Sequence, residues 1–191
     1  MDLLFSIFSA FGLSASAGLN AYIPLLVVAL LARFTDLIKL NPPWDTLTNV
    51  WVIILLVVLS AIEFFADKFP AVNHVNDIIQ TFVRPAAGAV VFAASAKVIT
   101  DIHPALALAA GLLVAGSVHA VKSLAVRPAV TGITAGAGNV PVSIMEDVVS
   151  TVLSILSVVV PVLIAMFVIL FTSWIIWLLW RRANRIRSAT P

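Results

Sequence analysis

The chain alternates long apolar stretches with short polar segments. Ile53–Leu59 and Val158–Leu170 are apolar at consecutive positions, unlike the in–out alternation of a strand in a membrane β-barrel. Several stretches approach the roughly 20 residues that a helix needs to cross a bilayer. The pattern predicts an all-α, polytopic integral membrane helical bundle with five or six spans. The apolar stretches are Leu3–Ala32, Val50–Phe65, Pro85–Ile99, Pro104–Val121 and Ile144–Trp180.

The first stretch, Leu3–Ala32, is too long for one straight span. As an unbroken helix it would measure about 45 Å, against a hydrocarbon core of about 30 Å. Ser9, Gly12, Ser16 and Asn20 recur at near-helical spacing. Two interpretations stay open: a small-residue face that packs against another helix, or a discontinuous helix whose unwound backbone near Asn20 lines a cavity.

Residues Asn73–Arg84 combine an apolar face with a polar face that includes Asp77. The apolar positions Val75, Ile78, Ile79, Phe82 and Val83 follow the spacing of one helical face. Such a helix is too short to span a membrane, so we expect it to lie flat at the interface or to line the mouth of a cavity.

The segment Pro128–Val142 contains three glycines and two prolines but no charged residue. Non-helical backbone at membrane depth is tolerated only where protein buries it or where it lines a cavity. The segment is therefore either a re-entrant element around Asn139 or an exposed surface loop.

A capping box, Ser143–Glu146, follows this segment and predicts the start of the next helix. A polar stripe continues from it towards Pro161 and should face the bundle interior; it consists of Asp147, Ser150, Thr151, Ser154 and Ser157. The whole stretch to Trp180 is either two joined spans or one helix kinked at Pro161.

The tetrapeptide Val-Arg-Pro-Ala occurs twice, at Val83–Ala86 and Val126–Ala129. This suggests an internal repeat of two diverged halves, with Arg84 and Arg127 at equivalent places. Because arginine costs about 2.5–3.5 kcal/mol at the centre of a membrane helix, both arginines are expected near helix ends. In a repeat-built transporter the polar helix breaks at Asn20 and Asn139 would approach each other near the midplane.

Composition agrees with membrane insertion. The chain is 62% hydrophobic and 10% charged, with a mean hydropathy of +1.14. The arginines of the last eleven positions (Arg181, Arg182, Arg185, Arg187) predict a cytoplasmic C-terminus in the cell inner (plasma) membrane. We expect one transmembrane domain over residues 1–180 and a basic cytoplasmic tail over residues 181–191.

Polar residues within the apolar stretches suggest two kinds of site. The acidic residues Glu63, Asp67, Glu146 and Asp147, with Asn20, suit a proton or cation path, since burial favours protonation of a carboxylate. The basic residues Arg84 and Arg127, with His119 and Lys122, suit an anionic headgroup. A third interpretation is that these acids and bases simply pair with one another.

Enzyme and cofactor signals are missing from the sequence. Cysteine is absent, and His74, His103 and His119 form no close metal-ligand pair. Nucleophile-elbow, P-loop and H-E-x-x-H motifs are also absent. We therefore expect no cofactor and no metal, and the sequence favours a protein without enzymatic activity, with an intramembrane enzyme left open as an alternative.

Four motifs together resemble a family of small bacterial multi-pass membrane proteins known only as a domain of unknown function. They are Ala17–Pro24, Glu63–Pro70, Arg84–Gly88 and Gly138–Asp147. The resemblance implies a shared helical membrane fold with polar motifs at helix breaks, and it implies no activity.

Our functional hypothesis is a small-solute, ion or lipid-headgroup transporter or channel-like protein. The alternatives are a structural or assembly subunit of a larger membrane complex, and an intramembrane enzyme that acts on lipid. Expected partners are membrane lipid, a small solute or ion, and either further copies of the chain or other membrane subunits, but no nucleic acid.

Overall fold

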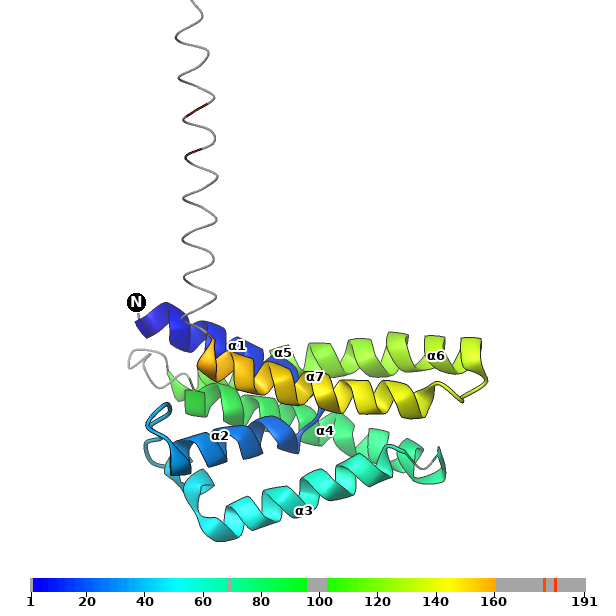
Figure 1. The fold of residues 1–191 in the computed structure, drawn as a ribbon, viewed down its shortest axis with the longest axis horizontal. Coiled ribbons are helices and arrows are strands. Elements are labelled where there is room, and N and C mark those ends of the chain that lie inside the picture. The colour runs from blue at the N-terminus through cyan, green and yellow to red at the C-terminus, as the bar shows by residue number, and fades with distance from the viewer. Residues whose placement is uncertain (1, 69, 96–102, 161–176, 178–180, 182–191) are drawn as a thin grey trace, which may run out of the picture.

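The computed structural model describes residues 2–68, 70–95, 103–160, 177 and 181, and these residues form helices but no strand (Figure 1). The all-helical fold is thereby confirmed. In chain order the elements are α1 (Asp2–Leu19), α2 (Tyr22–Phe34), the 3₁₀-helix η1 (Trp44–Thr48), α3 (Val50–Ala66), α4 (Pro70–Ser95), α5 (Pro104–Val121), the π-helix η3 (Lys122–Val126), α6 (Arg127–Thr134) and α7 (Asn139–Val159).

Three helical stretches are long and apolar enough to cross a membrane: Asn76–Ser95, Pro104–Thr134 and Asn139–Val159. Three shorter apolar helices accompany them in the described part of the chain: Ser6–Leu19, Tyr22–Phe34 and Val50–Ala66. The expected fifth and sixth spans rest on these shorter helices and on the stretch after Val160, most of which lies outside the described residues. The question of a kink at Pro161 lies there too.

The described helices bury many polar side chains and expose many apolar ones, which suits a lipid environment. On α7 the polar stripe predicted from the sequence is buried at Asp147, Ser150, Ser154 and Ser157 and half-buried at Thr151, whereas Val148, Val152 and Ile155 are exposed. Helix α3 likewise buries Glu63 while Trp51 is 78% exposed. Apolar side chains face outward because lipid, unlike water, does not penalise them.

The first apolar stretch breaks at Asn20, where the chain reverses from α1 into α2 (Figure 1). The small-residue face of α1 also packs, as one of the two interpretations expected. Ser16 Oγ lies 2.8 Å from Ser150 Oγ and 2.7 Å from Ser154 Oγ, and Gly12 leaves no room for a Cβ against Ser157. A packing face and a helix break therefore coexist in the same segment.

Helices α1, α4 and α5 meet closely at two glycines. Ser14 Oγ donates across this contact to the carbonyl oxygens of Gly88 (3.2 Å) and Gly111 (2.8 Å). A Cβ added at Gly111 would lie 2.6 Å from Phe92 Cβ and 2.8 Å from Ala89 Cα. The glycines thus set the helix separation at the centre of the bundle.

Two expectations about α4 are wrong: that Asn73–Arg84 forms a separate short helix, and that Arg84 lies near a helix end. The amphipathic segment and the third apolar stretch form one helix that continues through Pro85, so Arg84 lies within a helix and not at its end. The Arg84 side chain is fully buried in protein and ion-paired, which offsets the insertion cost that motivated the expectation. Arg127 does begin α6, but α6 continues the helical stretch Pro104–Thr134.

The uncharged glycine-rich segment is mostly helix. Pro128–Thr134 belongs to α6, and only Ala135–Gly138 forms a turn, with positive φ at Ala135 (50°) and Gly136 (90°). The predicted capping box is wrong, because α7 begins at Asn139 and Ser143 lies in its second turn. The turn before α7 is formed by the positive φ angles of Ala135 and Gly136. Ser143 therefore does not cap the helix, and its Oγ has no hydrogen-bond partner among the described residues.

Candidate functional site

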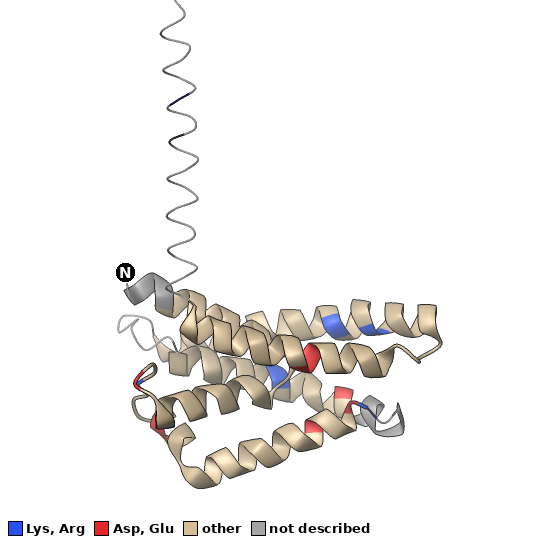
Figure 2. Cartoon of the chain, in the orientation of Figure 1, with Lys and Arg blue, Asp and Glu red and all other residues tan. Residues whose placement is uncertain are grey.

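Most charged residues of the described helices gather in one zone of the bundle, and a second, smaller group that includes Arg33 and Asp45 lies at the α2–η1 end (Figure 2). We call the first zone the charge cluster. It contains four carboxylates and four cations, connected by ion pairs: Glu63, Asp67, Glu146 and Asp147 with Lys68, Arg84, Lys122 and Arg127. With equal numbers of each sign, the cluster has no formal net charge at neutral pH.

Arg84 joins α4 to α3 and α5. Its guanidinium donates to Glu63 Oε1 from Nε (3.2 Å) and Nη2 (3.0 Å), and its Nη1 lies 3.1 Å from Nδ1 of the buried His119. His119 Nε2 in turn lies 3.3 Å from Thr81 Oγ1. Because Arg84 and Glu63 are both fully buried, each depends on the other for compensation of its charge.

The break between α1 and α2 is held by the same cluster. Asn20 Oδ1 accepts hydrogen bonds from the backbone N–H groups of Tyr22 and Ile23, both 3.1 Å, while Asn20 Nδ2 donates to Asp147 Oδ1 at 3.0 Å. The Ala21 N–H donates to Glu63 Oε2 at 3.1 Å. These bonds satisfy N–H groups at the start of α2, where the helix dipole also favours a carboxylate.

Four residues of the cluster close a ring of ion pairs, which we call the four-residue ring: Asp67, Lys122, Glu146 and Arg127. Glu146 Oε2 lies 2.9 Å from Lys122 Nζ and 2.7 Å from Arg127 Nη2. Asp67 Oδ2 lies 3.8 Å and 3.4 Å from the same two nitrogens. Each carboxylate in the ring is therefore shared between two cations.

The π-helix η3 brings Lys122 and Arg127 to the same carboxylate. In a regular α-helix, residues five positions apart point about 140° away from each other. In η3 the Arg127 N–H bonds to the Lys122 carbonyl, five residues back, so the two side chains share a face. Pro128, which has no N–H, follows directly. π-Turns of this kind occur frequently at functional sites.

Asp67 connects the two halves of the cluster. Its Oδ2 lies 3.5 Å from Arg84 Nη2 and 3.4 Å from Arg127 Nη2, and its Oδ1 accepts a 2.7 Å hydrogen bond from Asn76. Burial by itself would raise the pKa of Asp67, but Lys122, Arg84 and Arg127 outweigh burial and hold its pKa below the ordinary value. The arginines of the two Val-Arg-Pro-Ala tetrapeptides thus converge on one ionised carboxylate. The internal repeat itself stays a prediction.

A polar cavity of about 800 Å³ opens on one side of the four-residue ring. Its charged walls are Asp67, Lys68, Asp77 and Arg127, and the α6–α7 turn contributes Gly136 and Asn139. This volume lies within the range of ligand sites, about 300–1,000 Å³.

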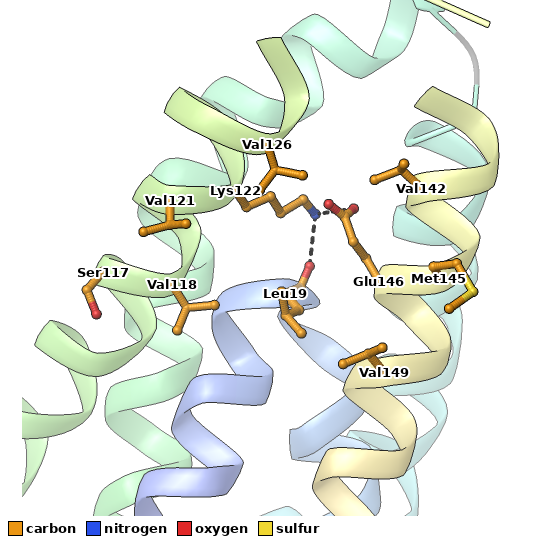
Figure 3. A pocket seen from close by; sticks show the side chains of 10 residues that line it. All are labelled: Leu19, Ser117, Val118, Val121, Lys122, Val126, Val142, Met145, Glu146 and Val149. Carbon is orange, nitrogen blue, oxygen red and sulfur yellow. Dashed lines mark hydrogen bonds and ion pairs between the residues drawn. The ribbon is translucent and has the colours of Figure 1, made fainter. Parts of the chain in front are cut away.

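An apolar groove of about 450 Å³ lies between α5, η3 and α7, beside the tip of α1 (Figure 3). Val118, Val121, Met145 and Val149 are among its lining residues. Its inner end holds the ion pair of Lys122 and Glu146, and Lys122 Nζ also donates to the Leu19 carbonyl at 3.0 Å (Figure 3). The four-residue ring therefore contributes two residues to the groove and the other two to the polar cavity.

The structure brings together most of the candidate residues chosen from the sequence. Eight lie in or against the charge cluster: Asn20, Glu63, Asp67, Arg84, His119, Arg127, Glu146 and Asp147. Asp77 lines the polar cavity. The pairing interpretation of the acids and bases describes this geometry best.

Asn139 is the exception. It exchanges hydrogen bonds of 2.9 and 3.2 Å with Thr131 at the cavity wall. Asp147, the partner of Asn20, lies eight residues further along α7, or about 12 Å along the helix axis. The two polar breaks therefore do not meet, and that expectation is wrong, because α6 and α7 extend beyond the level of the α1–α2 turn.

Sequence reasoning grouped Lys122 with the basic residues but did not select Lys68 or Asn76 as site residues. Lys68 Nζ lies 3.2 Å from Asp147 Oδ2 and sits over the Phe64 ring. The sequence signal for Lys122 was its position, one helical turn after His119 and five residues before Arg127.

An all-helical bundle with apolar residues outside and a paired charge cluster inside defines a helical membrane protein. Residues 7–181 match the family described as Domain of unknown function (DUF4126), and the chain belongs to that family. The family resemblance expected from the four motifs is thereby confirmed. A search of curated proteins and a search of solved structures both find no match.

Proposed function

We propose that this protein is a transporter or channel-like protein, in which the polar cavity is the entrance and the four-residue ring is the gate. The observation that carries the proposal is the position of the ring between a polar cavity and an apolar groove. Buried ion pairs add little stability over well-packed apolar residues. Ionisable residues inside a membrane protein commonly serve a path for solutes or ions.

The bonding of the ring suits reversible opening. Asp67 has three cationic neighbours, and Lys122 and Arg127 each have two acidic partners. A residue that releases one partner therefore keeps another, so opening leaves no charge fully unpaired. We propose that movement of α7 relative to η3 separates Glu146 from Lys122, while Glu146 keeps Arg127 and Lys122 keeps Asp67, and that this joins the cavity to the interior.

Thiol labelling of the full chain in membranes tests the gate, because the natural sequence has no cysteine. We expect Gly132→Cys, in the cavity wall, to react with a membrane-impermeant maleimide. Leu19→Cys, beside Lys122, should react at least about tenfold more slowly. Adding Glu146→Gln, which removes the charge shared by Lys122 and Arg127, should raise the labelling rate of Leu19→Cys.

The matched control is Asp45→Asn in the Leu19→Cys chain, because Asp45 is an exposed carboxylate in η1. We expect no change in labelling rate. An unreactive Gly132→Cys would contradict a water-filled entrance. Equal labelling of Leu19→Cys with and without Glu146→Gln would contradict the gate.

We propose that the protein lies in the plasma membrane with a cytoplasmic C-terminus. The arginine-rich end supports this orientation, and Arg181 lies over the Trp177 ring at 5.1 Å, a pairing suited to the membrane interface. A reporter fused after Pro191 should be active only where its activity requires the cytoplasm. Activity of an export-dependent reporter, such as a periplasmic phosphatase, would contradict the orientation.

The alternative of an assembly subunit has less support. That hypothesis needs small-residue helix faces that remain available to partners. Gly12, Gly18, Gly88 and Gly111 all pack against other helices of this chain. The lipid-enzyme alternative needs Glu63 and Asp67 together at a cavity wall, and of these two only Asp67 lines the polar cavity.

A further inference from the structure

The apolar groove between α5, η3 and α7 is a gap that none of the described helices fills. Helix α1 ends at Leu19, where the chain turns into α2, and the groove lies beside this tip (Figure 3). At the inner end Lys122 Nζ pairs with Glu146 and donates to the Leu19 carbonyl. Apart from this pair and Ser117, the lining is apolar.

The walls of the groove are continuous with the surface that faces lipid. They belong to Pro104–Thr134 and Asn139–Val159, two stretches that are long and apolar enough to cross a membrane. Val121, Met145 and Val149 line the groove and are also exposed. A molecule that enters the groove from the side therefore comes from the hydrocarbon of the bilayer.

The size and charge of the groove suit a hydrocarbon chain. An apolar cavity of about 150 Å³ binds benzene, which has six carbon atoms. On that scale the groove, at about 450 Å³, has room for roughly 18 carbon atoms, or one acyl chain. Its charged residues, Lys122 and Glu146, pair with each other, so the groove presents no net charge to an ionic ligand.

We propose that the groove binds one acyl chain of a bilayer phospholipid, which enters sideways between η3 and α7. The chain contacts α5, α7 and the tip of α1 together, whereas a chain on an exposed helix face contacts protein on one side only. Because a membrane gives no hydrophobic driving force between apolar groups, this additional van der Waals contact holds the chain. The site goes beyond the proposed gate, since the chain binds whether or not the ring opens.

Native mass spectrometry of the purified full chain tests the site, with dioleoyl phosphatidylcholine as the probe. The protein is reconstituted with this lipid, extracted into a mild detergent and washed until loosely held lipid is removed. We expect the natural chain to retain one lipid molecule per chain. A natural chain that retains no lipid after this treatment would overturn the inference.

The decisive variant is Val149→Trp, which places a large side chain in the groove. Its matched control is Val152→Trp on the same helix. Val149 and Val152 are 43% and 49% exposed, and of the two only Val149 lines the groove. We expect Val149→Trp to lower lipid retention at least about fivefold, because it takes the volume and the contacts of the chain. Val152→Trp should retain lipid as the natural chain does. Equal retention in the two variants would contradict the site.

Photo-crosslinking of the natural chain locates the lipid without any substitution. A phosphatidylcholine with a diazirine in one acyl chain is bound first, and excess unlabelled lipid then displaces loosely held molecules before irradiation. The remaining adducts should lie at groove residues such as Val121 and Met145. Adducts spread evenly over other exposed apolar residues, such as Ile54 and Phe82, would overturn the inference.

The same mass spectra identify a different occupant. A dimer of the natural chain that Val149→Trp dissociates, without any retained lipid, would show a second copy in the groove and overturn the lipid site. Lipid retention does not require opening of the ring. A failed thiol-labelling experiment with Val149-dependent lipid retention would therefore reject the gate and keep the site, and the reverse result would do the opposite.

Discussion

Arg84→Met should lower the free energy of unfolding far more than a surface substitution does. Arg84 is fully buried, and its loss leaves the equally buried Glu63 without its ion-pair partner and Asp67 with one cation fewer. Removing one partner of a buried ion pair costs about 3–5 kcal/mol. The free energy of unfolding in detergent, measured by chemical denaturation, should fall by that amount.

A second substitution separates charge from packing. In the double variant Glu63→Gln with Arg84→Met, no buried carboxylate is left unpaired at this position, and the introduced glutamine can still accept the hydrogen bond from the Ala21 N–H. We expect the double variant to recover a large part of the lost stability. Arg33→Met, at an exposed arginine that donates to the Thr48 carbonyl, is the control and should cost less than about 1 kcal/mol. A double variant less stable than Arg84→Met would contradict this account.

Gly111→Val should also have a large effect, through packing alone. Its new side chain would meet Phe92 Cβ and Ala89 Cα at 2.6 and 2.8 Å, and the Gly88 carbonyl closer still. Because two of these neighbours are backbone atoms of α4, α4 and α5 would have to move apart. Overpacking of a core typically costs about 1–3 kcal/mol, and occasionally more. Loss of the Ser14 hydrogen bonds to Gly88 and Gly111 would add to this cost.

The matched control is Gly132→Val, because a Cβ at that position meets nothing. The thermal midpoint of Gly132→Val in detergent should stay close to that of the natural chain, while that of Gly111→Val falls clearly. Similar midpoints for both variants would show that α4 and α5 separate at little cost, and that the glycine contact does not hold the bundle together.

Several features of the fold follow from the sequence because they depend on local pattern. Apolar runs of near-bilayer length identify the helices, and the uneven polar stripe on α7 identifies its buried face, since polar residues in lipid turn inward. The length of the first stretch requires a tilt or a break, and the structure shows the break at Asn20, one of the two interpretations left open. The clustering of Glu63 with Asp67 also follows locally, because residues four apart share a helix face.

Other features depend on contacts between segments far apart in the chain, and patterns within a segment do not determine them. The insertion cost of arginine suggested a helix end at Arg84, but Arg84 lies within a continuous α4 and pairs with the buried Glu63 of α3. The capping-box pattern at Ser143 was outweighed by the turn at Ala135–Gly138, which starts α7 four residues earlier.

The sequence by itself determined that this is a helical membrane protein, that its first apolar stretch is too long for one straight span, and which residues of α7 face inward. Local periodicity and hydrophobicity are sufficient to predict these features. Each segment in lipid must satisfy its own backbone hydrogen bonds, and its own apolar pattern shows which face is buried. Only the tertiary structure decided that Asp67, Lys122, Glu146 and Arg127 close a ring, that a π-turn aligns two of its cations, and that Asp77 lines the polar cavity beside this ring. Those features depend on distances of a few ångströms between α3, α4, η3 and α7, and such distances arise only when the helices pack together.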